Sequence, residues 1–162
     1  MIANTTGDDG AERGQRFVLR LPAQTGYLAV VRELIAAATR EHAFPPHDVA
    51  KVVMAVDEAC VNVVEHAYAD AGSDALPLDV VVSVDPHCLD VTIVDQASTE
   101  FSPLDHPLPD LEHLWESGES GGLGVLILRQ FMDHVSHSYQ PGRGNSLRLV
   151  KYVSSAQHPS PV

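Results

Sequence analysis

The positions of hydrophobic and polar residues along the chain follow two different periods, and each period predicts one kind of secondary structure. Between Ala23 and about His42, apolar residues recur every three or four positions, as on the buried face of an amphipathic helix. The same period runs through residues 49–68, after Pro45 and Pro46, without an interrupting Gly or Pro. Its buried stripe is expected to contain Val52, Val56, Ala59, Val63 and Ala67.

Five shorter stretches are rich in β-branched residues and are therefore predicted to be strands. They are residues 17–21, 78–84, 89–94, 135–139 and 146–153. Tight turns at 85–88 and 141–144 join four of these strands into antiparallel pairs. A third helix is expected from Val125 to about Asp133. This order of elements predicts an α/β two-layer sandwich, with a mixed, mostly antiparallel sheet covered on one face by three helices.

The composition divides the 162 residues into three parts. Residues 1–14 are polar and are expected to form a disordered lead-in. Residues 15–153 form the predicted single domain, and residues 154–162 a flexible tail. Residues 97–120 are acidic and contain several prolines, with a short helical turn expected at 111–115. A loop of this length is either a lid over a site or a disordered segment.

The charge of the chain limits the classes of partner. The formal net charge is -12, which argues against direct binding to nucleic acid or to an anionic membrane surface. No Lys or Arg occurs between Lys51 and Arg129, so a phosphate bound by this part would need backbone N–H groups and a divalent cation. The sequence shows no signal-peptide pattern and no apolar run that spans a bilayer, and a cytoplasmic protein is therefore expected.

Glu58, Asn62 and His66 stand four residues apart within the predicted helix 49–68, beside its apolar stripe. They form a polar row that advances about 40° around the helix with each step. A carboxylate can accept a proton, and a carboxamide one turn away can offer a neutral oxygen to Mg²⁺, so the pair suits a metal–nucleotide site. The alternative is the solvated side of an ordinary amphipathic helix, because such short motifs are common by chance.

Two further places carry candidate chemistry. Asp95 ends an apolar strand, where its carboxylate would accept a hydrogen bond from an exocyclic amine such as that of adenine, or would simply form a turn. Gly121, Gly122 and Gly124 open the third helix, where they would let free N–H groups approach an anion, or would serve as a hinge. Because the preceding loop is acidic, a phosphate at this place requires Mg²⁺. A zinc site is not favoured, since neither the nine histidines nor the two cysteines have a ligand spacing.

The order of these stretches resembles that of a known family. The stretches are Glu58-Ala-Cys-Val-Asn62-Val-Val-Glu-His66-Ala-Tyr68, then Asp95, then Gly121-Gly-Leu-Gly124. They are similar to the anti-sigma-factor serine/threonine kinases, a small bacterial branch of the GHKL ATPases, which also include histidine-kinase catalytic domains and gyrase. The resemblance extends over residues 17–153 and implies the Bergerat-type ATPase sandwich.

The resemblance also implies a role for individual residues. Glu58 matches the general base that prepares the substrate hydroxyl, Asn62 matches the residue that holds Mg²⁺, and Asp95 matches the aspartate that recognises the adenine amine. Residues 97–120 match the ATP lid. The other positions that match nucleotide-contacting residues of the family are Ala97, Gly121, Gly122, Leu123, Gly124 and Ser146, the last of which is expected near adenine.

The activity that the resemblance implies is phosphorylation of a serine or threonine, with ATP and Mg²⁺ as cofactors. In this family the substrate is an anti-sigma-factor antagonist of the STAS fold. The kinase also binds a sigma factor or another regulator, and many members are homodimers.

One position departs from the family pattern. Ala97 stands where the family has a glycine, and the run from there to Phe101 is about one residue longer. If the glycine is required, the alanine methyl costs about 1 kcal/mol, which weakens nucleotide binding up to about tenfold. A degenerate module that binds a regulatory partner without phosphotransfer therefore stays open. A third alternative is an ATPase without a protein substrate, which is less favoured because the sequence shows no transducer domain.

Overall fold

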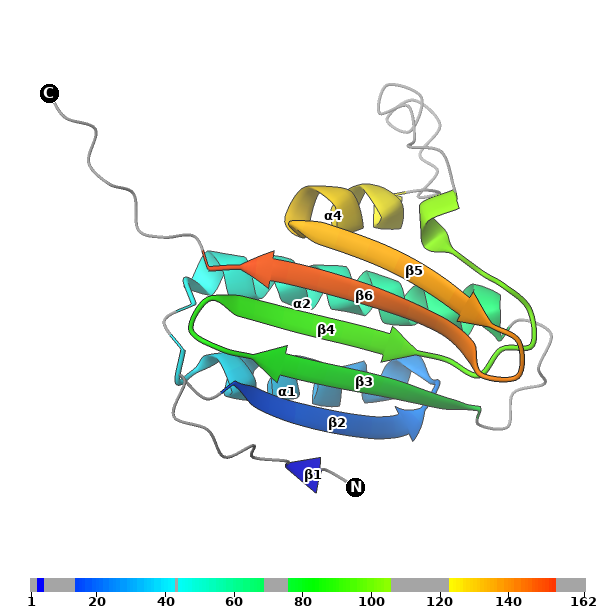
Figure 1. The fold of residues 1–162 in the computed structure, drawn as a ribbon, viewed down its shortest axis with the longest axis horizontal. Coiled ribbons are helices and arrows are strands. Elements are labelled where there is room, and N and C mark those ends of the chain that lie inside the picture. Colours follow the sequence, from blue (N-terminus) through cyan, green and yellow to red (C-terminus); the bar gives the residue numbers. More distant parts are fainter. Residues whose placement is uncertain (1–2, 5–13, 43, 69–75, 106–122, 154–162) are drawn as a thin grey trace, which may run out of the picture.

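The computed structural model of the chain describes residues 3–4, 14–42, 44–68, 76–105 and 123–153. In this part the chain forms one antiparallel sheet with its helices on a single face (Figure 1), as the sequence predicts. The strand order is β1-β2-β3-β4-β6-β5, and each pairing is antiparallel rather than mixed. The strands are β1 (Ala3–Asn4), β2 (Gln15–Pro22), β3 (Pro77–Val84), β4 (Cys88–Val94), β5 (His134–Gln140) and β6 (Gly144–Tyr152).

In the described residues, three α-helices cover the sheet, and three single turns of other helical types connect the elements. The α-helices are α1 (Leu28–Thr39), α2 (Pro46–Asn62) and α4 (Leu123–Phe131). The predicted start of the first helix at Ala23 is wrong, because a 3₁₀ turn, η1 (Thr25–Tyr27), separates α1 from β2. The predicted helix 49–68 also changes type, since α2 ends at Asn62 and continues as a π-helical turn, η2 (Val63–Ala67). A further 3₁₀ turn, η3, is formed by Pro103–Asp105.

The core lies between the sheet and the helices and is built by the two predicted periodicities. On β3 every second residue is buried, because successive side chains of a strand point to opposite faces. α2 packs against β4 and β6, and Val52 and Ala59 of its predicted stripe are completely buried. The inward residues of the two central strands are Leu78, Val80, Val82, Val84, Leu89, Val91 and Ile93.

The opposite face of the sheet carries polar side chains instead of a second layer of helices. Arg20 pairs with Asp79, and Arg148 pairs with Asp90, in each case between neighbouring strands. Such pairs satisfy an uncovered face and remain in contact with water. No helix in the described residues is long and apolar enough to cross a membrane.

Several predictions fall partly on residues outside the described part of the chain. Ala3 and Asn4 pair with β2, so this short part of the predicted lead-in is not disordered. Residues 1–2 and 5–13 of the lead-in, the segment 106–122 with its predicted turn at 111–115, and the tail 154–162 lie outside the described residues. The predicted lid is therefore described only in its first part, up to Asp105.

Candidate functional site

The polar row predicted on α2 faces the first turn of α4. A Cβ atom placed on Gly124 would lie 2.9 Å from Glu58 Oε2 and 3.5 Å from Asn62 Nδ2. Both side chains are only partly buried, and they come together with a residue more than 60 positions away in the sequence. A glycine at this place therefore brings the start of a helix, with its free N–H groups, close to a carboxylate and a carboxamide.

The environment of Glu58 favours its protonated form. Burial raises the pKa of the Glu58 carboxyl, and the neighbouring negative charges of Asp57 and Glu65 raise it further. A carboxylate with a raised pKa is a stronger base, which suits a group that takes a proton from a hydroxyl.

His66 does not lie on α2 with Glu58 and Asn62, because the helix widens after Asn62 into the π-helical turn η2, which contains His66. Its ring instead lies 5.4 Å from the ring of Phe101, measured between centroids. Wide turns of this type are frequent at functional sites. Here the turn places the last residues of the helix against the chain that follows Asp95.

Asp95 is almost completely buried at the end of β4, and one of its two carboxylate oxygens is saturated. Oδ1 accepts hydrogen bonds from the backbone N–H groups of Ala97 (2.9 Å) and Asn145 (3.1 Å), and from Asn145 Nδ2 (3.0 Å). Within the described part of the chain, no hydrogen bond reaches Oδ2. Because Asp95 lines a cavity, Oδ2 is the acceptor that this carboxylate has left for a donor from outside.

Gly144 makes the approach of β6 to Asp95 sterically feasible. Its φ of 92° lies in the left-handed region, and a Cβ atom at this position would lie only 2.0 Å from the carbonyl oxygen of Asp95. The following residue, Asn145, then accepts a backbone hydrogen bond from the strand end, with Asp95 N–H donating to the Asn145 carbonyl over 3.0 Å. The sequence indicated a turn at this glycine but not this contact, since its partner lies about 50 residues away.

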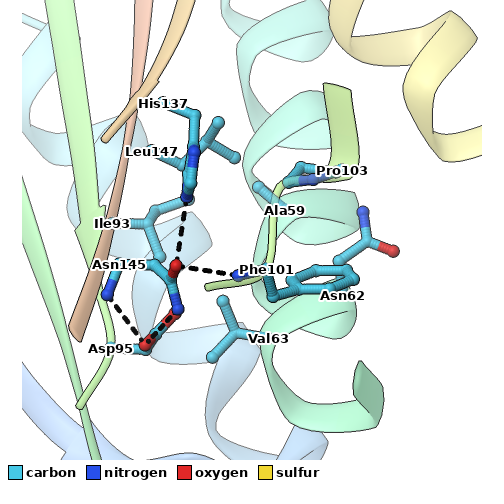
Figure 2. A pocket seen from close by; sticks show the side chains of 10 residues that line it. All are labelled: Ala59, Asn62, Val63, Ile93, Asp95, Phe101, Pro103, His137, Asn145 and Leu147. Carbon is cyan, nitrogen blue, oxygen red and sulfur yellow. Dashed lines mark hydrogen bonds between the residues drawn. The ribbon is translucent and has the colours of Figure 1, made fainter. Parts of the chain in front are cut away.

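The cavity beside Asp95 lies between the sheet and α2 and is nearly closed. Its accessible volume is about 10 Å³, which is room for about one water molecule. Figure 2 shows Asp95 and Asn145 on the sheet side of this cavity, and Phe101 and Pro103 on the side of α2. A purine base therefore does not fit into the cavity in this form, and the aromatic ring that closes it belongs to the segment predicted to be the lid.

The structure places the other predicted site residues as follows. Ala97 is buried and contacts Asp95 through its N–H group, whereas Leu123 begins α4 and is exposed. Ser146 does not line the cavity, because along β6 it faces the same way as Arg148, toward the uncovered side of the sheet. Its neighbour Asn145 occupies the place expected for it. Gly121 and Gly122 lie outside the described residues.

Two site residues that the sequence did not single out hold the site together. Asn145 is 3% exposed and contacts Asp95, the chain that follows it and His137. The hydroxyl of Tyr68 donates a hydrogen bond to the Pro77 carbonyl (2.8 Å) and accepts one from the N–H of Gln96 (2.7 Å). Burial raises the pKa of this hydroxyl to about 12, so it stays protonated and keeps both contacts over the physiological pH range. Only the Glu-x-x-x-Asn-x-x-x-His-Ala-Tyr stretch gave a signal for Tyr68.

The donor groups at the α2–α4 end suit a cation that is shared with a bound anion. In the described residues, no three His, Cys, Asp or Glu side chains come together as a metal site of their own. The Asn62 carboxamide supplies one neutral oxygen ligand. In Mg²⁺ sites, oxygens of substrate phosphates commonly supply further ligands. The backbone at the start of α4 would approach such a phosphate closely, because Gly124 has no side chain.

Comparisons with known proteins find a matching family, similar sequences and a similar fold. A model of the family described as "histidine kinase-like ATPase domain" matches residues 21–151. Curated relatives named "Serine-protein kinase RsbW", from Bacillus thuringiensis, Bacillus cereus and Bacillus anthracis, are each 27% identical over 154 residues, which cover 90% of this chain and 90% of the relative. A chain in the crystal structure of the SiaB-SiaC complex from Pseudomonas aeruginosa has a similar fold, with a TM-score of 0.63 at 12% sequence identity. That match covers 83% of this chain and 88% of the other.

Proposed function

The chain belongs to the histidine kinase-like ATPase domain family, and from this premise we propose that it is an ATP- and Mg²⁺-dependent protein serine/threonine kinase. The observation that carries the proposal is the convergence of Glu58 and Asn62 on Gly124 at the start of α4. This arrangement brings a base, a neutral oxygen ligand and helix N–H groups to one place, which are the groups that phosphoryl transfer requires.

The residues of the chain divide the work of such a reaction. Glu58 orients the incoming serine or threonine hydroxyl and takes its proton, while Asn62 holds the cation and the backbone at Gly124 holds phosphate oxygens. Bound Mg²⁺ would neutralise the negative charge of the phosphate groups. At the other end, Asp95 Oδ2 accepts a hydrogen bond from the exocyclic amine of adenine. By the resemblance of the motifs, Gly121, Gly122 and Leu123 also take part in phosphate binding, and Ala97 supports Asp95.

The partners follow from the relatives and from the resemblance of the motifs. The curated relatives carry the name serine-protein kinase. We infer that this chain acts as an anti-sigma factor in a partner-switching pathway in the cytoplasm. It phosphorylates a STAS-domain antagonist, and it also binds a sigma factor or another regulator, as a homodimer.

Transfer of labelled phosphate tests this function. The purified protein is incubated with γ-labelled ATP, Mg²⁺ and a STAS-domain protein from the same organism, and incorporation of label is followed with time. Glu58→Gln keeps the size of the side chain and removes the base, so the rate should fall by about 10² to 10⁴. Glu33→Gln, an exposed position on α1, is the matched control and should leave the rate unchanged. Transfer at the wild-type rate by the Glu58 variant would refute the assignment of the base.

The second candidate function is a module that binds a regulatory partner without phosphotransfer. It is favoured by Ala97 in place of the family glycine and by a cavity that holds about 10 Å³. Titration calorimetry with ATP and Mg²⁺ separates the two functions. A kinase gives saturable binding, whereas the degenerate module gives no heat at millimolar nucleotide.

A further inference from the structure

The segment that follows Asp95, residues 96–105, is held against the body of the protein at both of its ends, and we call it the strap. At its start, Gln96 N–H donates to the Tyr68 hydroxyl over 2.7 Å, and the Tyr139 hydroxyl donates to the Ser98 carbonyl over 2.6 Å. At its end, Arg129 Nη2 donates to the Leu104 carbonyl over 3.1 Å. Between these points the strap carries Phe101 across the cavity. It is thus held by Tyr68, which follows η2, by Arg129 of α4 and by Tyr139 of β5.

Asn145 fastens the middle of the strap and also contacts the carboxylate. A backbone N–H can only donate, so the N–H of Phe101, 2.9 Å away, identifies the Asn145 atom that it contacts as the carbonyl oxygen, Oδ1. Nδ2 of the same side chain therefore donates to Asp95 Oδ1 over 3.0 Å and to the Thr99 carbonyl over 3.2 Å.

The ring of His137 completes the set of contacts. His137 Nε2 lies 3.2 Å from Asn145 Oδ1, and since that oxygen only accepts, Nε2 carries the hydrogen. Both lone pairs of the carbonyl oxygen and both N–H groups of the amide are thus in use. A buried carboxamide with all of its hydrogen bonds made has one well-defined orientation.

We propose that Asn145 is a positioning residue that couples the carboxylate of Asp95, the proposed acceptor for the adenine amine, to the strap. This inference rests on the proposed function. In the free protein Asn145 holds the strap so that Phe101 and Pro103 close the cavity. A purine enters only when the strap leaves Asn145, Tyr139 and Arg129, while the contact from Asn145 Nδ2 to Asp95 remains. Nucleotide affinity is then reduced by the fraction of molecules that are open.

Two variants loosen the strap without touching Asp95. Tyr139→Phe removes only the hydrogen bond to Ser98, and Tyr139 does not line the cavity. Phe101→Ala removes the ring that closes it. Both should raise the association rate of a fluorescent ADP analogue, by about threefold for Tyr139→Phe and about tenfold for Phe101→Ala, because the open fraction rises. Tyr27→Phe, an exposed position on η1, is the matched control and should leave the rate unchanged.

Asn145→Ala separates positioning from a merely structural role. The substitution frees the strap, so the ADP analogue should associate faster. It also removes a donor to Asp95, so dissociation of the analogue should increase by an even larger factor. The preference for an adenine over a hypoxanthine base should fall by about tenfold, because Asp95 loses its fixed orientation. An equal loss of binding for both bases, without faster association, would overturn the proposed coupling.

Amide hydrogen exchange of the nucleotide-free proteins makes the test independent of nucleotide binding. The Phe101 amide should exchange at least about tenfold faster in Tyr139→Phe and in Asn145→Ala than in the wild type, because local opening becomes less costly. Unchanged exchange of the Phe101 amide in Tyr139→Phe and Asn145→Ala would overturn the proposal that these residues hold the strap closed. Slower nucleotide association in Phe101→Ala would overturn it as well. If neither the wild type nor any variant binds nucleotide, the proposed function fails, and amide exchange alone still decides whether Asn145 and Tyr139 hold the strap.

Discussion

The two ends of the candidate site differ in how their polar groups are satisfied. At the α2–α4 end, Glu58 and Asn62 are partly exposed and face a glycine at the start of a helix. At the β4–β6 end, Asp95 and Asn145 are buried and bonded to one another, and an aromatic ring closes the cavity beside them. On the proposed function, the first end receives a ligand without rearrangement, whereas the second must open.

This difference shows where a control point of the protein would lie. Glu58 and Asn62 are already accessible to a ligand, so the α2–α4 end is expected to change its conformation little when a nucleotide binds. The β4–β6 end exchanges a set of internal hydrogen bonds for contacts with a base, and each of these bonds contributes about 1 kcal/mol. The balance between the closed and open forms is therefore small enough for a ligand or a partner to shift.

The largest effect on stability is expected from a side chain at Gly144, which would disrupt the packing of β6 against the end of β4. Gly144→Ala places a methyl group into the Asp95 carbonyl and strains a positive φ, so the free energy of unfolding should fall by about 3 kcal/mol. Gly142→Ala is the matched control, because it has a similar φ but no heavy atom within 4 Å, and it should cost only about 1 kcal/mol. Urea unfolding measures both, and equal losses would show that the contact with Asp95 does not matter.

A smaller effect is expected from a side chain at the α2–α4 end. Gly124→Ala should leave the free energy of unfolding within about 1 kcal/mol of the wild type, because alanine favours the helix while its methyl group displaces the flexible Glu58 side chain. Nucleotide affinity should fall by about tenfold, since the backbone of α4 can no longer approach a phosphate as closely. Gly26→Ala, which meets no heavy atom within 4 Å, serves as the control in calorimetry. Unaltered affinity in Gly124→Ala would place the phosphates elsewhere.

The negative charges beside Glu58 predict a shift in the pH dependence of phosphotransfer. Burial first, and then the charges of Asp57 and Glu65, raise the pKa of Glu58, so the acid limb of phosphotransfer should lie above the ordinary range of a glutamate. Glu65→Gln removes one of these charges and should move that limb to lower pH, without changing the rate well above it. A pH–rate profile that is identical in the two proteins would show that Glu58 is not the titrating group.

The smallest effect concerns stability and has the opposite sign to the effect on activity. Because the folded pKa of Glu58 is raised, its contribution to stability is present at low pH and is lost as pH rises through that pKa. Glu58→Gln should therefore be more stable than the wild type at pH 7, by less than about 1 kcal/mol because solvent screens the partly exposed group. Thermal unfolding should show this difference disappear at a pH well below the ordinary pKa of glutamate. A variant that is less stable at pH 7 would contradict the raised pKa.

The sequence predicted the α2–α4 end better than the β4–β6 end, and the reason is the kind of signal that each leaves. Glu58 and Asn62 lie on one helix, where spacing alone places them side by side. Asn145 meets Asp95 only through the register of two strands, in which Val94 pairs with Ser146. Ser146 was expected at this place from the resemblance of the motifs. Because successive residues of a strand face opposite sides of the sheet, the neighbouring Asn145 is the one that faces Asp95.

The fold followed from the sequence because its core repeats the two simple periods. The elements that the period does not encode were missed: the 3₁₀ turn before α1, the π-helical turn after α2 and the strand at Ala3–Asn4. The closing of the cavity by Phe101 was also missed, because a loop without periodicity gives no signal for where its side chains pack. Such contacts depend on the whole tertiary arrangement rather than on local propensity.

The central claim is that Asp95 and the α2–α4 groups form one adenine nucleotide site, and affinity for two nucleotides tests it most directly. ATP and ITP differ in the exocyclic group of the base, which is an amine in ATP and a carbonyl in ITP. With Mg²⁺ present, the wild type should bind ATP at least about tenfold more tightly than ITP, because only the amine can donate to Asp95 Oδ2. Asp95→Asn should lose this preference. Equal affinity of the wild type for the two nucleotides, or a preference that survives in Asp95→Asn, would contradict the account.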